Sequence, residues 1–360
     1  MPWPRRVLLD LLGIEHPIIQ APMAGASTAA LAAAVSNAGA LGGFGGTDSS
    51  PDELREVIRA IRRLTDKPFI VNLYLDRVEP YVSVAACENA LKSALAPAHA
   101  ELQAGEVPDP IDLFGNFARQ VEVVIEERVA VLSSHFGAPD PAVMRALKAN
   151  GTRVIATATT VDEARELEAA GIDAVIAQGS EAGGHRGTFA APPAQAQIGT
   201  MALVPQIVDA ISVPVIAAGG IMDGRGVAAA LVLGASGVQM GTAFVACPET
   251  GVNPAYVQRL LTASPGDAVL TDAVTGRAAR LLRNRLVDLL ELNHKHRLAF
   301  PEQHSMTRKL RKAAAISGDA EFLPLWAGQG VMLARALPAA ELVASLVAES
   351  QRRLPPRWRI

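Results

Sequence analysis

A histidine inside a glycine-rich segment is the residue whose setting points most directly to catalysis. Residues 178–187 read QGSEAGGHRG, so His185 follows Gly183 and Gly184 and precedes Arg186. Glycine lets such a loop place a side chain freely, and an imidazole can give or take a proton near neutral pH. We predict that His185 is a general base; the alternative is a histidine on a solvent-exposed loop.

Two further glycine segments predict a phosphate site. Gly219 and Gly220 follow one apolar run, and Gly241 and Thr242 follow the next. Without a Cβ, backbone N–H groups can approach an anion closely, and a helix that starts there adds a favourable partial charge. The alternative is that these glycines only permit tight turns. Two such segments at successive strand ends favour a phosphate cradle.

Neutral amide side chains at two predicted strand ends suit the edge of a ring system. Asn72 and Gln178 can donate and accept hydrogen bonds there, although backbone groups could satisfy either of them instead. The glycine pair 183–184 would let the backbone lie flat against a bulky group, and Met23 lies in an apolar segment after the first strand. Together these residues predict a flat cofactor.

The remaining histidines and the cysteines do not indicate a metal site. His135 ends a predicted strand and is a second candidate for the active site. His294 and His296 form an HxH pair on a predicted helix, which would turn the two rings to different faces. Cys87 and Cys247 form neither a CxxC motif nor a disulfide framework. We therefore expect no metal.

The elements that carry these residues alternate regularly. Eight short apolar runs, nearly all followed by helical patterns, predict strands near residues 17, 41, 69, 129, 153, 174, 213 and 237. Eight parallel strands with helical crossovers predict an α/β fold, a closed (β/α)8 TIM barrel, with an open doubly wound sheet as the alternative. A TIM barrel has its site at the carboxyl ends of the strands, which would bring the candidate residues to one face.

Two stretches break this rhythm and predict a smaller, mostly helical lid or substrate domain. Residues 76–119 contain no convincing strand, and residues 251–322 are predicted to form helices, one of them beginning at 278 and ending at 292. Both stretches follow strand ends on the catalytic face, so they would form one composite lid over the cofactor. The barrel would consist of residues 1–75, 120–250 and 323–360.

Composition and charge exclude several classes of protein. Half of the 360 residues are hydrophobic and the formal net charge is −3, which disfavours disorder and a nucleic-acid surface spread over the whole protein. Basic runs at 277–285 and 308–312 are predicted to be solvated helix faces. No run reaches the roughly 18 apolar residues of a membrane span, and the first residues make a poor signal peptide. We expect a cytoplasmic protein with no nucleic-acid or membrane partner.

Six segments of the chain resemble one known family. They are QAPMAG at 20–25, SSHFG at 133–137, QGSEAGGHRG at 178–187, PVIAAGGI at 214–221, QMGTAF at 239–244 and PLWAGQ at 324–329. With these segments the chain resembles the nitronate monooxygenases, formerly called 2-nitropropane dioxygenases, and the last segment resembles their class I branch. The family fold is a TIM barrel with a smaller helical domain over the site.

The resemblance implies flavin mononucleotide (FMN) as the cofactor and His185 as the catalytic histidine. The implied flavin contacts, to which the predicted cradle adds Gly219, are Met23, Asn72, Gln178, Gly183, Gly220, Gln239, Met240, Gly241 and Thr242. The chain departs from the family pattern at Ala26, where a second glycine is usual, and at Ser134, where the residue is often aromatic. We assign Ser134 and its neighbour His135 to the substrate pocket.

The implied reaction is the oxidation of an alkyl nitronate, such as propionate 3-nitronate, by O2 to a carbonyl compound and nitrite. The flavin would carry the redox step. His185 would either remove the α-proton of a neutral nitroalkane or, when protonated, stabilise the negative charge of the nitronate. FMN-dependent NAD(P)H:quinone and enoyl-acyl-carrier-protein reductases are the alternative enzymes, and a flavin-binding sensor is the non-enzymatic alternative. We expect a monomer or homodimer.

Overall fold

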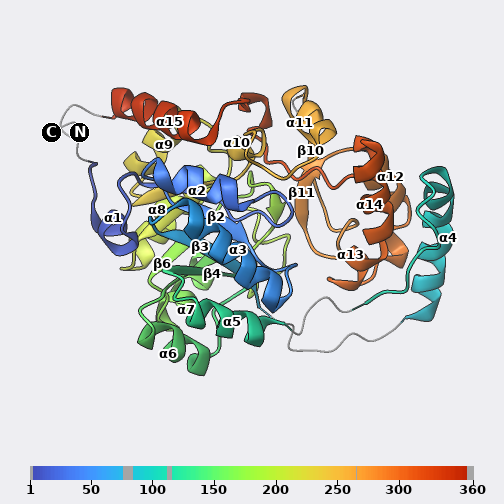
Figure 1. Ribbon diagram of the computed structural model, residues 1–360, viewed down its shortest axis with the longest axis horizontal. Helices are drawn as coiled ribbons and strands as arrows, with labels where there is room; N and C mark the ends of the chain where they lie inside the picture. Colours follow the sequence, from blue (N-terminus) through green and yellow to red (C-terminus); the bar gives the residue numbers. More distant parts are fainter. Residues whose placement is uncertain (1–2, 76–83, 112–115, 265, 355–360) are drawn as a thin grey trace.

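The chain folds around a ring of eight parallel strands (Figure 1). The computed structural model describes residues 3–75, 84–111, 116–264 and 266–354. The barrel strands, in chain order, are β1 (Ile18–Gln20), β2 (Gly42–Gly45), β3 (Phe69–Tyr74), β4 (Val131–His135), β5 (Arg153–Ala158), β6 (Ala174–Gln178), β8 (Val215–Ala218) and β9 (Gly237–Met240). Backbone hydrogen bonds from Gln20 N to Leu41 O and from Leu41 N to Ile18 O join β1 to the start of β2. They close the sheet, so the predicted TIM barrel is confirmed.

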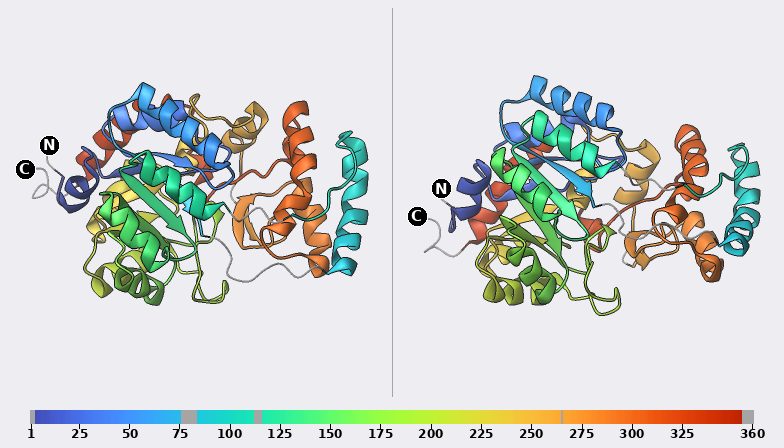
Figure 2. Two further views of the ribbon diagram at one scale, coloured as in Figure 1. Left: turned by 60° about the horizontal axis from the view of Figure 1, so that its bottom comes forward. Right: turned by 90° about the horizontal axis from the view of Figure 1, so that it is seen from below.

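Helices surround the barrel, and its strands are buried on both faces (Figure 2). The surrounding helices are α1 (Val7–Leu12), α2 (Ala29–Asn37), α3 (Pro51–Leu64), α5 (Phe117–Glu126), α6 (Pro141–Ala149), α7 (Val161–Ala169), α8 (Thr200–Ala210), α9 (Gly224–Val232) and the short α10 (Thr242–Val245). The final helix, α15 (Ala339–Arg353), packs on α9 and α2. Burial from both sides explains why the strands read as continuous apolar runs rather than alternating ones.

A second group of elements lies at one end of the barrel and has a hydrophobic core of its own (Figures 1 and 2). It contains α4 (Ala85–Glu101), α11 (Pro254–Leu261), β10 (Ala268–Thr271), β11 (Ala279–Leu282), α12 (Arg285–Leu292), α13 (Glu302–Met306) and α14 (Arg308–Ser317). Residues 76–83 and 112–115 of the predicted insertion lie outside the described residues. Within the described ranges, no helix is long and apolar enough to cross a membrane.

The predicted helix over 278–292 is wrong in its first half. Residues 279–282 form β11, and α12 begins only at Arg285, where the Asn284 side chain accepts a hydrogen bond from Val287 N. β11 pairs antiparallel with β10 and with a short strand that the sequence did not predict, β7 (Gly184–His185). Tertiary pairing therefore overrides a local pattern that suits a helix.

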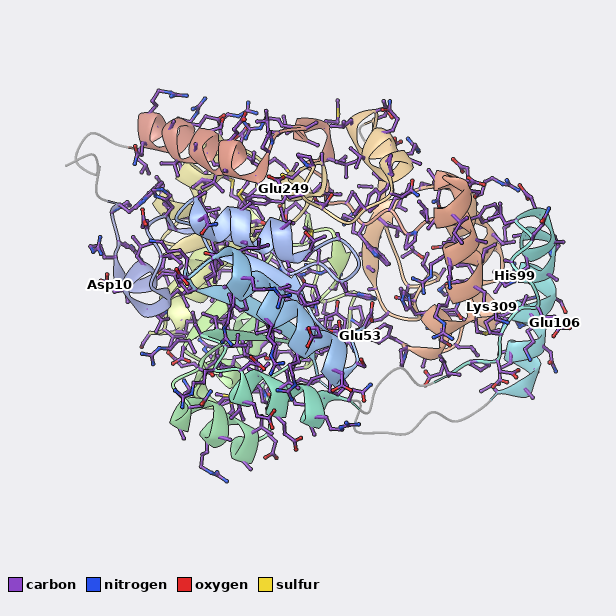
Figure 3. All side chains as sticks on the ribbon, in the orientation of Figure 1. Asp10, Glu53, His99, Glu106, Glu249 and Lys309 are labelled. Carbon is purple, nitrogen blue, oxygen red and sulfur yellow. The ribbon has the colours of Figure 1, made fainter. Side chains whose placement is uncertain are left out.

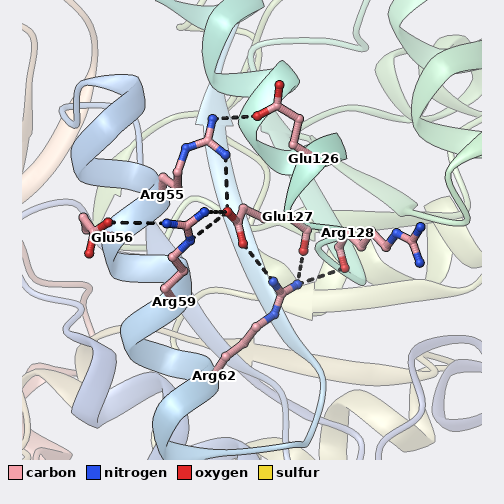
Figure 4. A network of polar contacts seen from close by, with 7 residues as sticks. All are labelled: Arg55, Glu56, Arg59, Arg62, Glu126, Glu127 and Arg128. Carbon is pink, nitrogen blue, oxygen red and sulfur yellow. Dashed lines mark hydrogen bonds and ion pairs between the residues drawn. The ribbon is translucent and has the colours of Figure 1, made fainter.

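An arginine cluster joins α3 to the end of α5 on the outside of the barrel (Figure 4). The Glu127 carboxylate, whose side chain is only 10% exposed, pairs with Arg55, Arg59 and Arg62 at 3.3, 2.9 and 3.0 Å. Arg55 also pairs with Glu126. Because one partly buried carboxylate accepts from three cations, this network holds two neighbouring barrel helices together better than isolated surface pairs would.

The outermost helix, α4, is anchored to α14 through the turn that follows it. Lys309 Nζ of α14 donates to the Glu106 carbonyl at 3.3 Å, and His99 Nδ1 lies 3.0 Å from the Gly105 carbonyl (Figure 3). Leu91 and Leu95 of α4 are buried in the second core. The helix from the insertion after β3 is therefore packed on elements that follow β9, although more than 100 residues separate them.

Substituting Glu127 tests the helix network. We expect Glu127→Gln to lower the melting temperature by about 2 °C, because three arginines lose their shared carboxylate. The loss should shrink in 1 M salt, which screens ion pairs. Thermal unfolding of Glu126→Gln is the matched control, since among the described residues Glu126 pairs with Arg55 alone and its side chain is 59% exposed. Equal losses in the two variants would contradict a special role for Glu127.

Candidate active site

A cavity of about 440 Å³ opens at the carboxyl ends of the barrel strands, beneath the second group of elements. Its volume is typical of small-molecule sites. Twelve of the thirteen predicted site residues line it: Met23, Asn72, His135, Gln178, Gly183, His185, Gly219, Gly220, Gln239, Met240, Gly241 and Thr242. The barrel therefore brings together residues from β1, β3, β4, β6, β8 and β9, as the strand-end argument anticipates.

Ser134 does not join this group. Its side chain is fully buried, and its hydroxyl donates to the Gly137 carbonyl at 2.7 Å. Side chains alternate along a strand, so Ser134 points to the opposite side of β4 from its neighbour His135, which lines the cavity. Ser134 stabilises the turn after β4 and does not contact the space where a substrate would bind.

The buried guanidinium of Arg186 holds the loop that carries His185 in place. Arg186 is 0% exposed; it donates to the carbonyls of Gly179 and Ala196 and to Gln178 Oε1 at 2.6, 2.7 and 3.1 Å. Burial, and then the charge of Arg280, lower its pKa to about 10, so it remains a cation at neutral pH. Hydrogen bonds from both terminal nitrogens offset much of the cost of burying this cation and fix the loop around it, although Nε has no partner among the described residues.

Gln178 binds its own loop rather than facing the cavity with a free amide. Its Oε1 accepts from Arg186 Nη1 and from Gly187 N, and its Nε2 donates to the His185 carbonyl at 3.0 Å. One N–H remains for a ligand. The sequence predicted that Gln178 hydrogen-bonds to the edge of a ring system. The structure adds that the same amide positions the backbone of His185.

The carboxylate of Glu163 holds the next turn of this loop. Glu163 is fully buried and accepts from Thr188 Oγ1, Phe189 N and Ala190 N on one oxygen, and from Thr159 on the other. Burial alone would raise the pKa of Glu163, but these hydrogen bonds outweigh it and lower the pKa. The carboxylate is therefore ionised and offsets the nearby charge of Arg186.

The second group of elements also binds the loop that carries His185. β7 pairs with β11 so that His185 lies opposite Ala279, and the Arg186 amide donates to the Ala278 carbonyl at 2.9 Å. Arg280, buried in β11, donates through Nε and Nη2 to the Ser180 carbonyl. A Cβ at Gly183 would lie 2.6 Å from Gly328 N, so only glycine fits where these segments cross.

Two hydroxyl groups fix the imidazole of His185. Its Nε2 lies 3.0 Å from Thr275 Oγ1, and its Nδ1 lies 3.4 Å from the Tyr74 hydroxyl. Thr275 already donates its hydroxyl hydrogen to the Arg277 carbonyl at 2.9 Å, so its oxygen must accept from His185. The ring therefore carries its proton on Nε2, and the basic lone pair is on Nδ1, on the side of Tyr74.

The electrostatic surroundings keep His185 neutral. Burial, and then the charges of His135 and Arg277, lower the pKa of His185 to about 3. Burial and Arg277 likewise lower the pKa of His135 to about 4. At neutral pH both imidazoles can accept a proton but carry no positive charge. The neutral state disfavours a protonated His185 that stabilises an anion and leaves Nδ1 without a proton.

An aromatic wall surrounds the imidazole, and Phe300 and Trp326 in it are not among the predicted site residues. Tyr74 stacks on His135 with ring centroids 5.3 Å apart, while Phe300 and Trp326 lie 5.0 and 5.5 Å from His185. Tyr74 ends β3, so the strand-end rule that selected Asn72 could also have selected it. Phe300 precedes α13 and belongs to no strand end. Trp326 lies in the PLWAGQ segment that carries part of the resemblance.

Arg277 supplies a fixed charge behind this wall. Its guanidinium lies 3.6 Å from the centroid of the Phe136 ring and donates to the Thr188 carbonyl. Burial lowers its pKa to about 10, which leaves it charged. Arg277 and Arg280 thus contradict the prediction that residues 277–285 form a solvated helix face: both are inside the protein, where a cation–π contact and carbonyl groups replace water.

The fold and the cavity define a (β/α)8-barrel enzyme with its site at the carboxyl ends of the strands. The family model for nitronate monooxygenase matches residues 5–349. A nitronate monooxygenase from Pseudomonas aeruginosa is 49% identical over 343 residues, which cover 94% of this chain and 97% of the relative. One from Paraburkholderia phytofirmans is 45% identical over 350 residues, which cover 96% and 95%. This chain belongs to the nitronate monooxygenase family, and it is an oxidoreductase.

A solved structure supports the same assignment. The nitroalkane oxidase from Streptomyces ansochromogenes superposes with a TM-score of 0.87 at 40% identity, covering 96% of this chain and 98% of that one. The family resemblance seen in the sequence is therefore confirmed. Members of the nitronate monooxygenase family are flavoproteins, so a flavin cofactor is implied for this chain.

The residues of the cavity fit a flavin. Gln239 Oε1 is buried and has no hydrogen-bond partner among the described residues, so it can accept from a ring N–H group. Asn72 Nδ2 donates to Ser133, which leaves its Oδ1 for a second ring contact. Gly219 and Gly220 have φ values of +114° and +70°, a backbone that side chains rarely adopt. A phosphate cradle formed by this backbone would therefore depend on glycine at both positions.

Histidine burial predicts how stability changes with pH. Burial lowers the pKa of His135, His185 and His304 in the folded protein, whereas the same side chains titrate near 6.5 when unfolded. Below pH 6.5 the unfolded chain binds more protons, so stability should fall as the pH drops from 7 to 5.

The melting temperature at a series of pH values checks this expectation. We expect a fall of several degrees between pH 7 and 5, and a shallower slope in His135→Asn, which removes one titrating group. A melting temperature that is constant over this range would contradict neutral histidines in the folded state.

Proposed function

We propose that this protein is an FMN-dependent enzyme that oxidises alkyl nitronates with O2 to a carbonyl compound and nitrite. The observation that carries the proposal is a neutral His185 whose Nδ1 carries no proton, placed in the same cavity as the glycine segments and the side-chain amide oxygens of Asn72 and Gln239. The family assignment supports the oxidation of nitronates in general. FMN, O2 and the products are the finer parts of the proposal.

The proposed FMN contacts divide by chemistry. The phosphate would bind the backbone at Gly219, Gly220, Gly241 and Thr242, at the ends of β8 and β9, where barrels of this fold commonly bind phosphate. The ring would contact Asn72, Gln178, Gly183 and Gln239, with Met23 and Met240 supplying apolar contacts. When bound, FMN supplies the redox chemistry, which no side chain of the cavity provides.

His185 would act as the general base when the substrate is a neutral nitroalkane. Its Nδ1 lone pair would accept the α-proton once the substrate replaces the long contact with Tyr74. Thr275 would hold the ring in the required tautomer, and the aromatic wall would exclude water. A nitronate has already lost this proton, so it would need His185 less.

We also propose that residues 76–119 and 251–322 act as one lid and substrate domain over the barrel. Elements from both stretches pack together, as the anchor between α4 and α14 indicates. Phe300, Pro301 and His304 from the later stretch line the cavity. The lid would thus supply part of the surface that contacts the substrate, together with His135 and His185 of the barrel, whereas the proposed cofactor contacts all come from the barrel.

The proposed activity is tested on the purified yellow holoprotein. Propionate 3-nitronate should consume O2 and release nitrite, and heat denaturation should release FMN, identified by chromatography. NADH and NADPH, with a quinone or with an enoyl thioester, form the comparison arm. Rapid flavin reduction by a nicotinamide without nitronate oxidation would favour a reductase and overturn the proposal.

Replacing His185 tests its role as a base. We expect His185→Asn to retain FMN but to lower kcat/KM for a neutral nitroalkane by about 100-fold or more. The loss with the corresponding preformed nitronate should be much smaller, because no proton must be removed. Steady-state O2 uptake with both forms measures the difference. Unchanged values for both forms would contradict any catalytic role.

Replacing Thr275 tests whether it positions the imidazole. Thr275→Val is nearly isosteric but cannot accept from Nε2, so we expect kcat for the nitroalkane to fall about 10-fold. Thr275→Ser retains the oxygen and should restore most of the activity. The pH dependence of kcat/KM should also shift only in Thr275→Val. A loss in both variants would indicate packing rather than tautomer control.

A further inference from the structure

One arginine of the basic run at 308–312 turns into the cavity instead of facing solvent. Arg308, Lys309 and Lys312 of α14 are exposed, as the predicted solvated face requires, but Arg311 lines the cavity together with His304. The prediction for this run is therefore wrong at Arg311 alone. A cationic side chain loses hydration on entering a cavity, so its orientation calls for an explanation.

The guanidinium of Arg311 is fixed on one side by α13 and the residue that follows it. Its Nε donates to Thr307 Oγ1 at 3.1 Å, and its Nη2 lies 3.1 Å from the His304 carbonyl and 3.0 Å from His304 Nε2. No hydrogen bond of Nη1 is found among the described residues. The group is thus held in one orientation with one nitrogen still able to donate, which lowers the entropy cost of binding an anion.

Among the residues that the structure describes, no direct ion pair neutralises the charge of Arg311. Burial lowers the pKa of Arg311 to about 10, so it is a cation at neutral pH. Its neighbour His304 is neutral, because burial and then Arg311 lower the pKa of that imidazole. Within the described ranges, no carboxylate lies within ion-pair distance of Arg311, although Asp48 acts on it from farther away.

Asp48 is the acidic group that shares this part of the cavity. It lines the cavity from the segment after β2, where solvent reaches it through the opening. Surrounding protein raises the pKa of Asp48, and the charge of Arg311 opposes that rise. Among the described residues, Asp48 makes no direct ion pair with Arg311, so Arg311 can attract a second anionic group.

We propose that Arg311 binds a carboxylate at the end of the substrate away from the reacting carbon, and so selects carboxylated nitronates over those with an uncharged tail. His304 contacts Arg311 and lies within electrostatic range of His185, so it spans the region between the cation and the proposed base. The cavity would then have a reacting end at His185 and a charge-recognising end at Arg311. This inference rests on the proposed function, because it concerns which nitronate the same cavity accepts.

The experiment compares two nitronates of equal chain length in the holoenzyme. Propionate 3-nitronate carries the terminal carboxylate, and propyl 1-nitronate carries a methyl group there. We expect Arg311→Met to raise KM for the carboxylated substrate about 10- to 100-fold and to leave KM for propyl 1-nitronate nearly unchanged. Arg311→Lys should retain part of the preference, since it keeps the charge but not the planar donor.

Two further variants sharpen the comparison. Lys312→Met removes an exposed cation from the same helix and should change neither KM, which excludes a general effect of net charge. Asp48→Asn removes the competing carboxylate and should lower KM for propionate 3-nitronate, opposite in sign to Arg311→Met. Equal effects of Arg311→Met on both nitronates, or no effect on either, would overturn the inference.

Calorimetry measures ligand binding without turnover, so it tests the carboxylate site independently of the proposed function. 3-Nitropropionate and 1-nitropropane differ in the same carboxylate and are titrated into wild-type and Arg311→Met holoproteins. If no nitronate is oxidised but the wild type alone binds 3-nitropropionate, the proposed function fails and the carboxylate site stands. If nitronates are oxidised and both proteins bind 3-nitropropionate equally, the carboxylate site fails and the proposed function stands.

Discussion

The buried guanidinium of Arg186 fixes the loop that carries His185, and the geometry of the cavity depends on that loop. Two carbonyls and the Gln178 amide surround Arg186, and the charge of Glu163 offsets its own at longer range. These hydrogen bonds fix the position of each acceptor. Because His185 directly precedes Arg186, they also fix the backbone of His185. A buried cation that has few other hydrogen-bond acceptors thus fixes the site more rigidly than a flexible glycine loop could by itself.

The charges around the cavity serve two purposes at once. Arg277 helps to keep His185 and His135 neutral, and with Arg311 it makes the cavity favourable for anions. In the proposed reaction, a neutral His185 would accept a proton without first losing one. Neither property follows from the net charge of −3, because it is the burial of particular arginines that matters.

The parts of this protein that could be predicted from sequence are those set by local patterns. Continuous apolar runs identified eight strands, and residues at the strand ends identified twelve of the cavity residues, because a parallel barrel brings all carboxyl ends to one face. The second half of the site was not predictable in this way. Arg311 lines the cavity because α14 packs over it, and Thr275 and Arg277 lie behind the cavity wall, where Thr275 contacts His185. Arg277 and Arg311 belong to basic runs that the sequence predicts as solvated helix faces.

The pairing of β7 with β11 also limits how readily the second group of elements could be replaced by that of another protein. His185 belongs to the barrel by sequence but to the lid sheet by its backbone hydrogen bonds. A chimera that grafts a different lid onto this barrel would lack the edge that aligns the imidazole, even if every barrel residue were retained. If the second group of elements is the proposed lid, substrate range would change more readily by substitution within it than by its replacement, because β7 and β11 pair with each other and would have to be kept together.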